Sequence, residues 1–329
     1  MQRERSIDIA KGLGILLVVL GHLIDSFNAD IPGVYGYVYL FHVPLFFFIS
    51  GLFYHESDSL GKTALNKARR LFVPYLAANV LFWLVEMARV WKMGDMYDGD
   101  LGFRDLLLAV AGLWPVPSMF SRPTWFLLVL FRVSILYKII QMLTGSRKWC
   151  MAAISIAAGV AGALTSVGDV MIGQTLVALA FFSAGHVLRP LLIGSMDRWQ
   201  MKYAMPAAVV TSALLYPISL HQMTNIAVNV YGNCVLFFLG AVLGTILVLL
   251  ISSMLSRLGR VSDAISFVGR HTMAVLIWHV FIMKVLFTIS EKLLASPVPV
   301  PVYIVVYIVA AICPCLLASI RMPGKTERK

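Results

Sequence analysis

The sequence predicts an all-α protein, a polytopic bundle of about ten transmembrane helices with both termini in the cytoplasm. Sixty per cent of the 329 residues are hydrophobic and only 13% are charged, a balance that excludes a water-soluble globular domain. The apolar residues form separate runs of about 17 to 25, each long enough to cross a hydrocarbon core of about 30 Å. The basic residues fall in the short segments between these runs, mostly on one side of the predicted membrane.

Charges or turn-forming residues bound each apolar run. The first run ends in Gly21-His22 without a small-residue cleavage site, so we interpret it as a retained helix rather than a signal peptide. The segment 91–123 combines acidic residues with three prolines, and we expect it to lie on the membrane surface or to re-enter it. In chain order, the expected spans are 9–27, 34–54, 71–90, 124–143, 150–167, 170–188, 204–220, 234–255, 271–289 and 300–320.

The distribution of Lys and Arg sets the expected orientation. Eighteen of them fall on one side of these spans, against four on the other, which are Lys92, Arg104, Arg122 and Lys292. The positive-inside rule therefore puts both termini in the cytoplasm, and it explains the net charge of +11 better than nucleic-acid binding does. We expect residues 1–329 to form one membrane domain, with 321–329 as a short basic cytoplasmic tail. The four cysteines lack metal-type spacing, so we expect apolar packing and no metal site.

The first run carries two ionisable residues, Lys11 and His22, within the sequence IDIAKGLGILLVVLGH. At about 100° per residue, their separation of eleven positions comes within about 20° of three full turns. The two side chains therefore share one helix face, about 16 Å apart. Lipid disfavours ionisable groups by several kcal/mol, so this face should meet protein or a water-filled cavity.

Other spans place ionisable groups at a similar depth. Counting about 1.5 Å per residue puts His42, Glu86 and Arg132 in one layer with His22, above the bilayer midplane, and His279 somewhat deeper. Such a layer is a candidate functional site. On the residues alone, the histidines are equally explained as interhelical hydrogen-bond partners, Glu86 and Arg132 as a structural ion pair, and Lys11 as a lysine that snorkels to the headgroups.

Several segments resemble the acyltransferase-3 membrane family, in the order that the family shows. The first is Asp8-x-x-Lys11 followed by His22, which is similar to the family's first-helix signature of Arg or Lys, ten residues and His. Two others are FHVPLFFFISGLFY at 41–54 and KARRLFVPYL at 67–76, the latter resembling a basic R-x-x-R segment. TWFLLVLF, FFSAGHVLRP and VGRHTMAVLIWHVF complete the resemblance, which covers nearly the whole chain.

This resemblance implies an enzyme of the bacterial inner or cytoplasmic membrane that moves an acetyl group from cytoplasmic acetyl-CoA to a hydroxyl of a surface or exported glycan. The stand-alone form most resembles the fucose 4-O-acetylase-like branch. The acceptor would be a glycan or a lipid-linked saccharide, and acetyl-CoA would be a substrate, with no permanently bound cofactor. Lys11 and Lys67 stand where many members have Arg, which keeps the charge but loses the bidentate guanidinium.

On this interpretation His22 is the catalytic residue, either as the general base or as a nucleophile that is itself acetylated. Lys11 would hold the phosphates or the thioester end of the donor, and Lys67 and Arg70 would draw the polyanionic nucleotide to the entrance. The competing interpretation is a secondary transporter in which His22, Glu86 and Arg132 relay protons. A third, an assembly partner in a glycan-export complex, leaves the buried charges unexplained.

Overall fold

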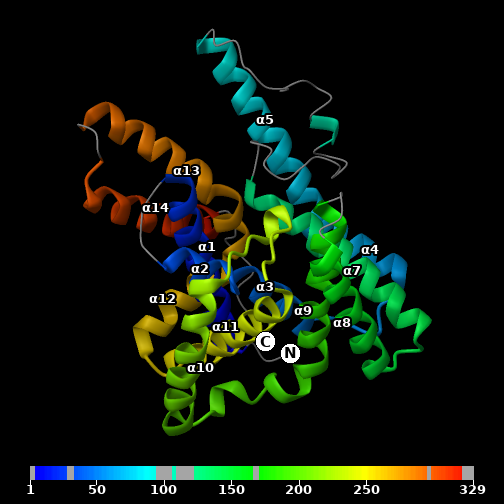
Figure 1. Ribbon diagram of the computed structural model, residues 1–329. Helices are drawn as coiled ribbons and strands as arrows, with labels where there is room; N and C mark the ends of the chain where they lie inside the picture. The colour runs from blue at the N-terminus through cyan, green and yellow to red at the C-terminus, as the bar shows by residue number, and fades with distance from the viewer. Residues whose placement is uncertain are drawn as a thin grey trace. The chain divides into compact units, whose positions relative to one another are not determined.

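The computed structural model describes residues 4–27, 33–93, 106–108, 122–165, 170–294 and 298–320, and the regular elements in these ranges are helices (Figure 1). Ten of them are long and apolar enough to cross a membrane, which confirms the expected all-α polytopic class. The orientation of the termini stays a prediction. The tail 321–329 and most of the segment 91–123 lie outside the described residues.

Most helices begin and end within a few residues of the expected spans. In chain order they are α1 (Arg5–Phe27), α2 (Val34–Tyr39), α3 (His42–Leu52), α4 (Leu60–Lys67), η1 (Ala68–Phe72), α5 (Val73–Met93), η2 (Arg122–Thr124), α7 (Trp125–Leu143), α8 (Lys148–Thr165), α9 (Val170–Leu192), η3 (Met196–Arg198), α10 (Met201–His221), η4 (Ile226–Val228), α11 (Cys234–Leu255), α12 (Gly259–Arg270), α13 (Thr272–Leu293) and α14 (Val300–Ile320).

These helices pack into two compact units. The first comprises Met1–Ile49, Arg189–Thr224 and Val235–Lys329, and therefore holds α1, α2, α10 to α14 and most of α3. The second comprises Ser50–Leu188 and Asn225–Cys234, and holds α4, η1, α5, α7, α8 and most of α9. The expectation of a single membrane domain stays a prediction.

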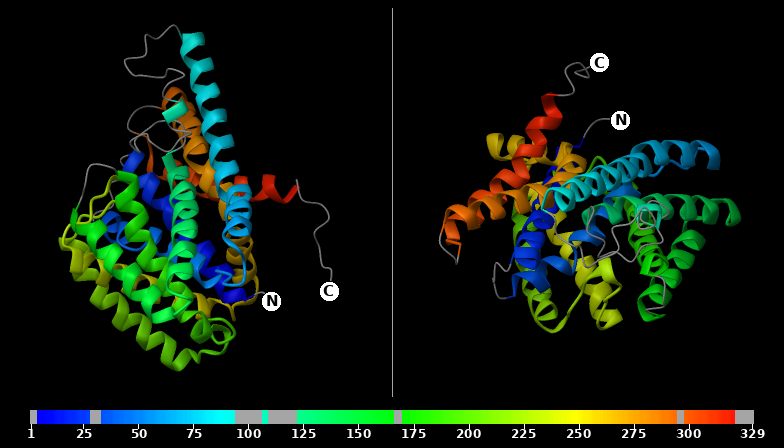
Figure 2. Two further views of the ribbon diagram at one scale, coloured as in Figure 1. Left: turned by 90° about the vertical axis from the view of Figure 1, so that its right-hand side faces the viewer. Right: turned by 90° about the horizontal axis from the view of Figure 1, so that it is seen from above.

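The first unit is built around α1, which packs against α2, α12, α13 and α14. Its closest approach is to α12, where a Cβ atom on Gly12 would collide with the Ile265 carbonyl and one on Gly269 with the Asp8 carbonyl. Glycine at both positions thus lets the two backbones touch. One turn after Gly12, the Tyr307 hydroxyl of α14 donates to the Leu16 carbonyl at 3.2 Å. Figure 2 shows α13 and α14 running side by side in this unit.

Two contacts from the same unit hold the amino end of α1. The Asp197 carboxylate of η3 accepts a hydrogen bond from the Ser6 amide at 3.2 Å, which satisfies an N–H that has no partner within the helix. Arg5 forms an ion pair with Asp263 of α12 at 2.5 Å. Polar contacts therefore fix the amino end of α1, and close backbone packing fixes its middle.

The sequence interpretation missed α12, which it treated as a loop between two spans. This helix of 12 residues has an amphipathic pattern with nearly equal apolar and polar content, so it does not stand out as an apolar run. Its buried face carries small residues, Ser262, Ser266 and Gly269, together with Val268. These small residues are what allows it to lie so close to α1.

Two expected spans differ from the helices in the structure, and each contains a proline. The span 34–54 is broken into α2 and α3, because Pro44 has no N–H to bond to the Leu40 carbonyl four residues back. The span expected at 71–90 begins much earlier, as one helical stretch of 33 residues from Leu60 to Lys92. Within it, the Val73 amide bonds to the Ala68 carbonyl five residues back, a π turn next to Pro74.

Candidate functional site

The first unit brings together two of the sequence-predicted site residues. The imidazole rings of His22 on α1 and His279 on α13 lie with their centroids 5.1 Å apart and their planes tilted by 51°. Counting depth along each span separates these residues, whereas the structure makes them neighbours. The depth estimate fails because it assumes that all spans start at one level in the membrane. In the structure the helix α12 precedes α13, so the starting level of α13 does not follow from the sequence.

His279 is completely buried, and its own helix fixes its ring. Its Nδ1 lies 2.7 Å from the Val275 carbonyl, four residues back. Since a carbonyl can only accept, Nδ1 carries the hydrogen and Nε2 keeps a lone pair. This Nε2 is buried and has no hydrogen-bond partner among the described residues. The structure thus places a buried nitrogen with a lone pair next to the His22 ring.

Tyr39 links His42 to this pair of histidines. Its Nδ1 bonds to the Val38 carbonyl at 2.7 Å, so its tautomer is fixed in the same way. The His42 ring packs edge-on against Tyr39, with centroids 5.0 Å apart. The Tyr39 hydroxyl in turn donates to the carbonyl of Gly21, next to His22, at 3.5 Å. The structure therefore gathers three predicted histidines in one unit, two of them in ring contact.

Lys11 occupies the other end of the same face of α1. Its ammonium forms an ion pair with the Asp8 carboxylate at 3.5 Å, and its side chain is 27% exposed. The continuous helix Arg5–Phe27 confirms the regular spacing that places Lys11 and His22 on one face, about 16 Å apart. The pairing with Asp8 was not predicted, although Asp8 belongs to the motif.

Glu86 has a local partner in the second unit. The Arg89 Nε, one turn further along α5, donates to the Glu86 carboxylate at 2.8 Å. The structure thus gives Glu86 an ion pair with Arg89 within its own helix, which the sequence interpretation did not predict. The role of Glu86 in a layer of ionisable groups stays a prediction.

Arg132 lies beside the basic segment of the second unit. The Phe72 ring stacks on Phe131 with centroids 5.5 Å apart, which sets Arg132 of α7 level with the π turn η1 that carries Arg70. Lys67 is half-buried at the end of α4, and Arg70 is exposed. The sequence count put Arg132 well inside the membrane and Lys67 and Arg70 at the entrance. In the structure α4, η1 and α5 continue as one helical stretch, so Lys67 and Arg70 lie within this stretch and not in a loop before it.

A polar cluster that sequence analysis did not find holds the segment before α4. The Glu56 backbone carbonyl accepts hydrogen bonds from Lys138 Nζ at 2.9 Å and from Gln141 Nε2 at 3.2 Å, both on α7. The Gln141 side-chain oxygen accepts from Lys138 at 2.7 Å and from the Tyr54 hydroxyl at 2.6 Å. Lys138 and Gln141 are buried, so these bonds satisfy groups that would otherwise be costly in the interior.

The Glu56 carboxylate continues this cluster into α8 and α9. It contacts His186 Nε2 at 2.8 Å and the Lys148 ammonium at 3.3 Å. His186 Nδ1 lies 2.8 Å from the Tyr137 hydroxyl, which accepts from Ser183 at 3.4 Å. Neutral His186 satisfies every contact by donating Nε2–H to Glu56 and accepting from Tyr137. His186 lies near the end of a span in the sequence, so only the tertiary structure reveals its role.

The charges around Glu56 shift its acidity. Partial burial acts to raise the pKa of the Glu56 carboxyl, but the Lys148 ammonium and the hydrogen bond with His186 outweigh it and hold the pKa below its ordinary value. The carboxylate is therefore ionised throughout the neutral range. The cluster joins the segment before α4 to α7, α8 and α9.

Comparisons with known proteins support the resemblance. A family profile described as an acyltransferase domain matches residues 4–320. The nodulation protein NolL of Mesorhizobium japonicum is 29% identical over 166 residues, which cover 47% of this chain and 40% of NolL. NolL of Sinorhizobium fredii is 29% identical over 165 residues, covering 47% of this chain and 42% of the relative. The matched segment thus spans less than half of either relative. No solved structure matches the chain significantly.

The lowered pKa of Glu56 predicts a particular loss of stability in acid. Its contribution is present above the unfolded-state pKa of about 4.3 and disappears as the pH falls through the lower folded-state value. We expect the wild type to melt at a higher temperature than Glu56→Gln at pH 7, and this difference to shrink below about pH 4.3.

Thermal unfolding of both purified proteins between pH 7 and pH 3.5 measures this effect. Glu291→Gln, at an exposed position on α13, serves as the matched control and should follow the wild type at every pH. A difference between wild type and Glu56→Gln that stays constant down to pH 3.5 would show that the carboxylate contacts do not stabilise the fold.

Proposed function

This chain belongs to the acyltransferase family whose profile matches residues 4–320, and on that premise we propose that it is a membrane O-acetyltransferase. It takes an acetyl group from cytoplasmic acetyl-CoA and places it on a hydroxyl of a surface or exported glycan, with the bacterial cytoplasmic membrane as its location. The observation that carries this proposal is the stripe of α1 that holds Lys11 and His22, with His279 against His22.

The chemistry requires a base for the acceptor. A sugar hydroxyl has too high a pKa to attack a thioester unaided, and imidazole is the side chain best matched to remove its proton near neutral pH. In the direct route, His22 takes the hydroxyl proton while the oxygen attacks the thioester carbonyl. The carbon–sulfur bond then breaks, and the proton passes to the departing thiolate.

The second route uses the same residue as a nucleophile. A His22 nitrogen attacks the thioester carbonyl and CoA leaves as the thiol, which gives an acetyl-imidazole. The glycan hydroxyl then attacks this group in a second step and restores the imidazole. His279 acts in either route as the neighbour that packs against the His22 ring and presents its own buried Nε2 lone pair. Its Nδ1 bond to Val275 holds that orientation.

The cations serve the donor. Lys11 lies toward the amino end of α1 and holds a phosphate or the thioester end, while Lys67 and Arg70 attract the nucleotide. A cluster of basic side chains at an opening raises the local concentration of a polyanion such as CoA. Lys11 is partly exposed and Arg70 is exposed, so both cations are accessible to such a ligand.

A transfer assay tests the function directly. Radiolabelled acetyl-CoA is supplied to the cytoplasmic side of proteoliposomes that contain a lipid-linked glycan, and the label on the glycan is measured. We expect the label to appear on the glycan in a protein-dependent manner. Glycan movement across the membrane without acetyl transfer would instead support the transporter.

The first mutational prediction compares His22 with His42. Removing a general base typically lowers the rate by about 10² to 10⁴, whereas losing one interhelical hydrogen bond costs about 1 kcal/mol of stability. We expect His22→Ala to fold, to bind acetyl-CoA and to transfer acetyl at least a hundredfold more slowly. His42→Ala, the matched control, should lose less activity.

Transfer and acetyl-CoA binding are measured on the same purified variants, which separates catalysis from donor binding. If His22→Ala binds the donor and still acetylates within tenfold of the wild type, the base is another residue.

The second mutational prediction concerns Lys11. If its charge holds the donor, Lys11→Arg should keep substantial activity, because the positive charge remains, while Lys11→Ala should lose most of it at equal expression. Initial rates at several acetyl-CoA concentrations measure the effect. Wild-type rates for Lys11→Ala would mean that the lysine only snorkels to the headgroups and that the donor is held elsewhere.

A further inference from the structure

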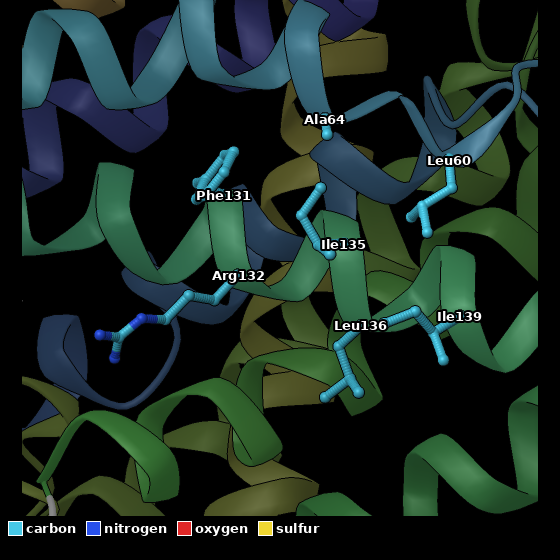
Figure 3. Close-up of a pocket in the computed structure, with 7 residues that line it drawn as sticks. All are labelled: Leu60, Ala64, Phe131, Arg132, Ile135, Leu136 and Ile139. Carbon is cyan, nitrogen blue, oxygen red and sulfur yellow. The ribbon is translucent and has the colours of Figure 1, made fainter. Parts of the chain in front are cut away.

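An open hollow of about 460 Å³ lies in the second unit, between α4 and α7 (Figure 3). Its lining is almost entirely hydrocarbon, with one charged side chain. In Figure 3 the Arg132 guanidinium points away from the apolar side chains, with Leu60 and Ile139 at the opposite end of the row. The residues that line it are Leu60 and Ala64 of α4 and Phe131, Arg132, Ile135, Leu136 and Ile139 of α7.

Exposed apolar side chains continue this surface beyond the hollow. Leu65 follows Ala64 on α4 and is exposed, as are Met142 and Leu143 at the end of α7, the latter with 81% of its surface accessible. Both the helical stretch Leu60–Lys92 and α7 are long and apolar enough to cross a membrane. The apolar surface around the hollow is therefore of the kind that contacts bilayer lipids.

The chemistry of the lining selects among possible occupants. The pantetheine arm of CoA contains two amides, and burying an amide without a hydrogen-bond partner is unfavourable. Among the residues that line the hollow, Arg132 is the one with a polar side chain, and a guanidinium only donates hydrogen bonds. A hydrocarbon chain with an anionic group close to one end fits this lining without such a penalty.

We propose that the hollow binds one anionic phospholipid of the surrounding bilayer. One acyl chain lies along Ile135, Leu136 and Ile139, and the phosphate is held by the Arg132 guanidinium, whose planar fork suits a phosphate. In a phospholipid only the glycerol separates the phosphate from the chain, which matches a cation placed directly beside a hydrocarbon lining. An acyl-CoA places the whole pantetheine arm between its phosphates and its acyl group.

A second positive charge lies close to the hollow on the same helix face. Lys67 comes three residues after Ala64 and seven after Leu60, so these three side chains lie on one side of α4. Basic side chains between transmembrane helices commonly bind anionic headgroups, and here Arg132 alone contacts the phosphate while Lys67 only adds to the positive potential nearby. The site prefers a lipid with net negative charge over a zwitterionic one, which distinguishes it from general contact with the bilayer.

Native mass spectrometry of the full chain, purified and exchanged into detergent with defined lipids, tests the proposal. The probes are phosphatidylglycerol and phosphatidylcholine with identical chains. We expect about one phosphatidylglycerol per protein to be retained and phosphatidylcholine to compete at least tenfold less well. Arg132→Gln should reduce retention at least tenfold, while Arg132→Lys should keep part of it.

Filling the hollow provides an independent variant should Arg132→Gln fail to fold. Ala64→Phe puts a ring into the space that the chain occupies and should also reduce retention at least tenfold. Leu65→Phe, the neighbouring and outward-facing position, should stay within twofold of the wild type. Equal retention of the two lipids, or unchanged phosphatidylglycerol retention in both Arg132→Gln and Ala64→Phe, would overturn the proposal.

A competition with acetyl-CoA separates this site from the donor site. We expect phosphatidylglycerol to remain bound in the presence of saturating acetyl-CoA, and Ala64→Phe to bind acetyl-CoA as the wild type does. Displacement of the lipid by acetyl-CoA, together with weaker acetyl-CoA binding by Ala64→Phe, would assign the hollow to the donor instead. None of these measurements requires acetyl transfer, so they stand apart from the proposed function.

Discussion

The backbone contact between α1 and α12 at Gly12 and Gly269 is the constraint on which the first unit depends. Any side chain at either glycine would push the helices apart, because the atoms it would meet belong to the opposing backbone. Gly12 follows Lys11 directly, so the close contact fixes the rotation of α1 about its axis. Since His22 lies three turns further on the same face, this rotation also determines where its imidazole points. Close packing at Gly12 and Gly269 thus positions the face of α1 that carries Lys11 and His22.

In the second unit, the polar cluster around Glu56 has the positioning role that close backbone packing has in the first unit. Tyr137, Lys138 and Gln141 on one face of α7 hold Tyr54, Glu56 and His186 through hydrogen bonds, while Arg132, Ile135, Leu136 and Ile139 on a neighbouring face line the hollow with α4. Glu56 lies four residues before the start of α4. The N-terminal turn of α4 is fixed further by an ion pair between Lys62 and Asp58 at 2.7 Å. The polar cluster on one face of α7 therefore determines how α4 packs against the neighbouring face of α7.

Apolar run length alone predicted most spans well, and α11 and α14 begin and end at the expected residues. The failures share a cause, which is that tertiary packing stabilises helices whose composition is not apolar. α12 is nearly balanced in polarity and packs on α1, and α4 carries Lys62 and Lys67 and packs on α7. Contacts between residues of different spans could not be predicted from the sequence. Counting the depth of each residue along its span assumes that all spans start at the same level in the membrane. The motif predicted Lys11 and His22 as site residues, whereas the ring contact with His279 and the polar cluster around Glu56 depend on tertiary structure that the sequence does not reveal.

The ion pair between Asp8 and Lys11 bears on how a donor would engage the motif. An unpaired ammonium near a membrane-spanning segment is costly, and a carboxylate one turn away offsets that cost while the donor is absent. On the proposed function, a CoA phosphate, which carries more negative charge than Asp8, would replace the carboxylate as the partner of an ammonium that remains partly exposed. The exchange needs no movement of α1, which its glycine contacts hold in place. On that proposal, the helix would bind and release the donor at one end while His22 keeps its orientation at the other.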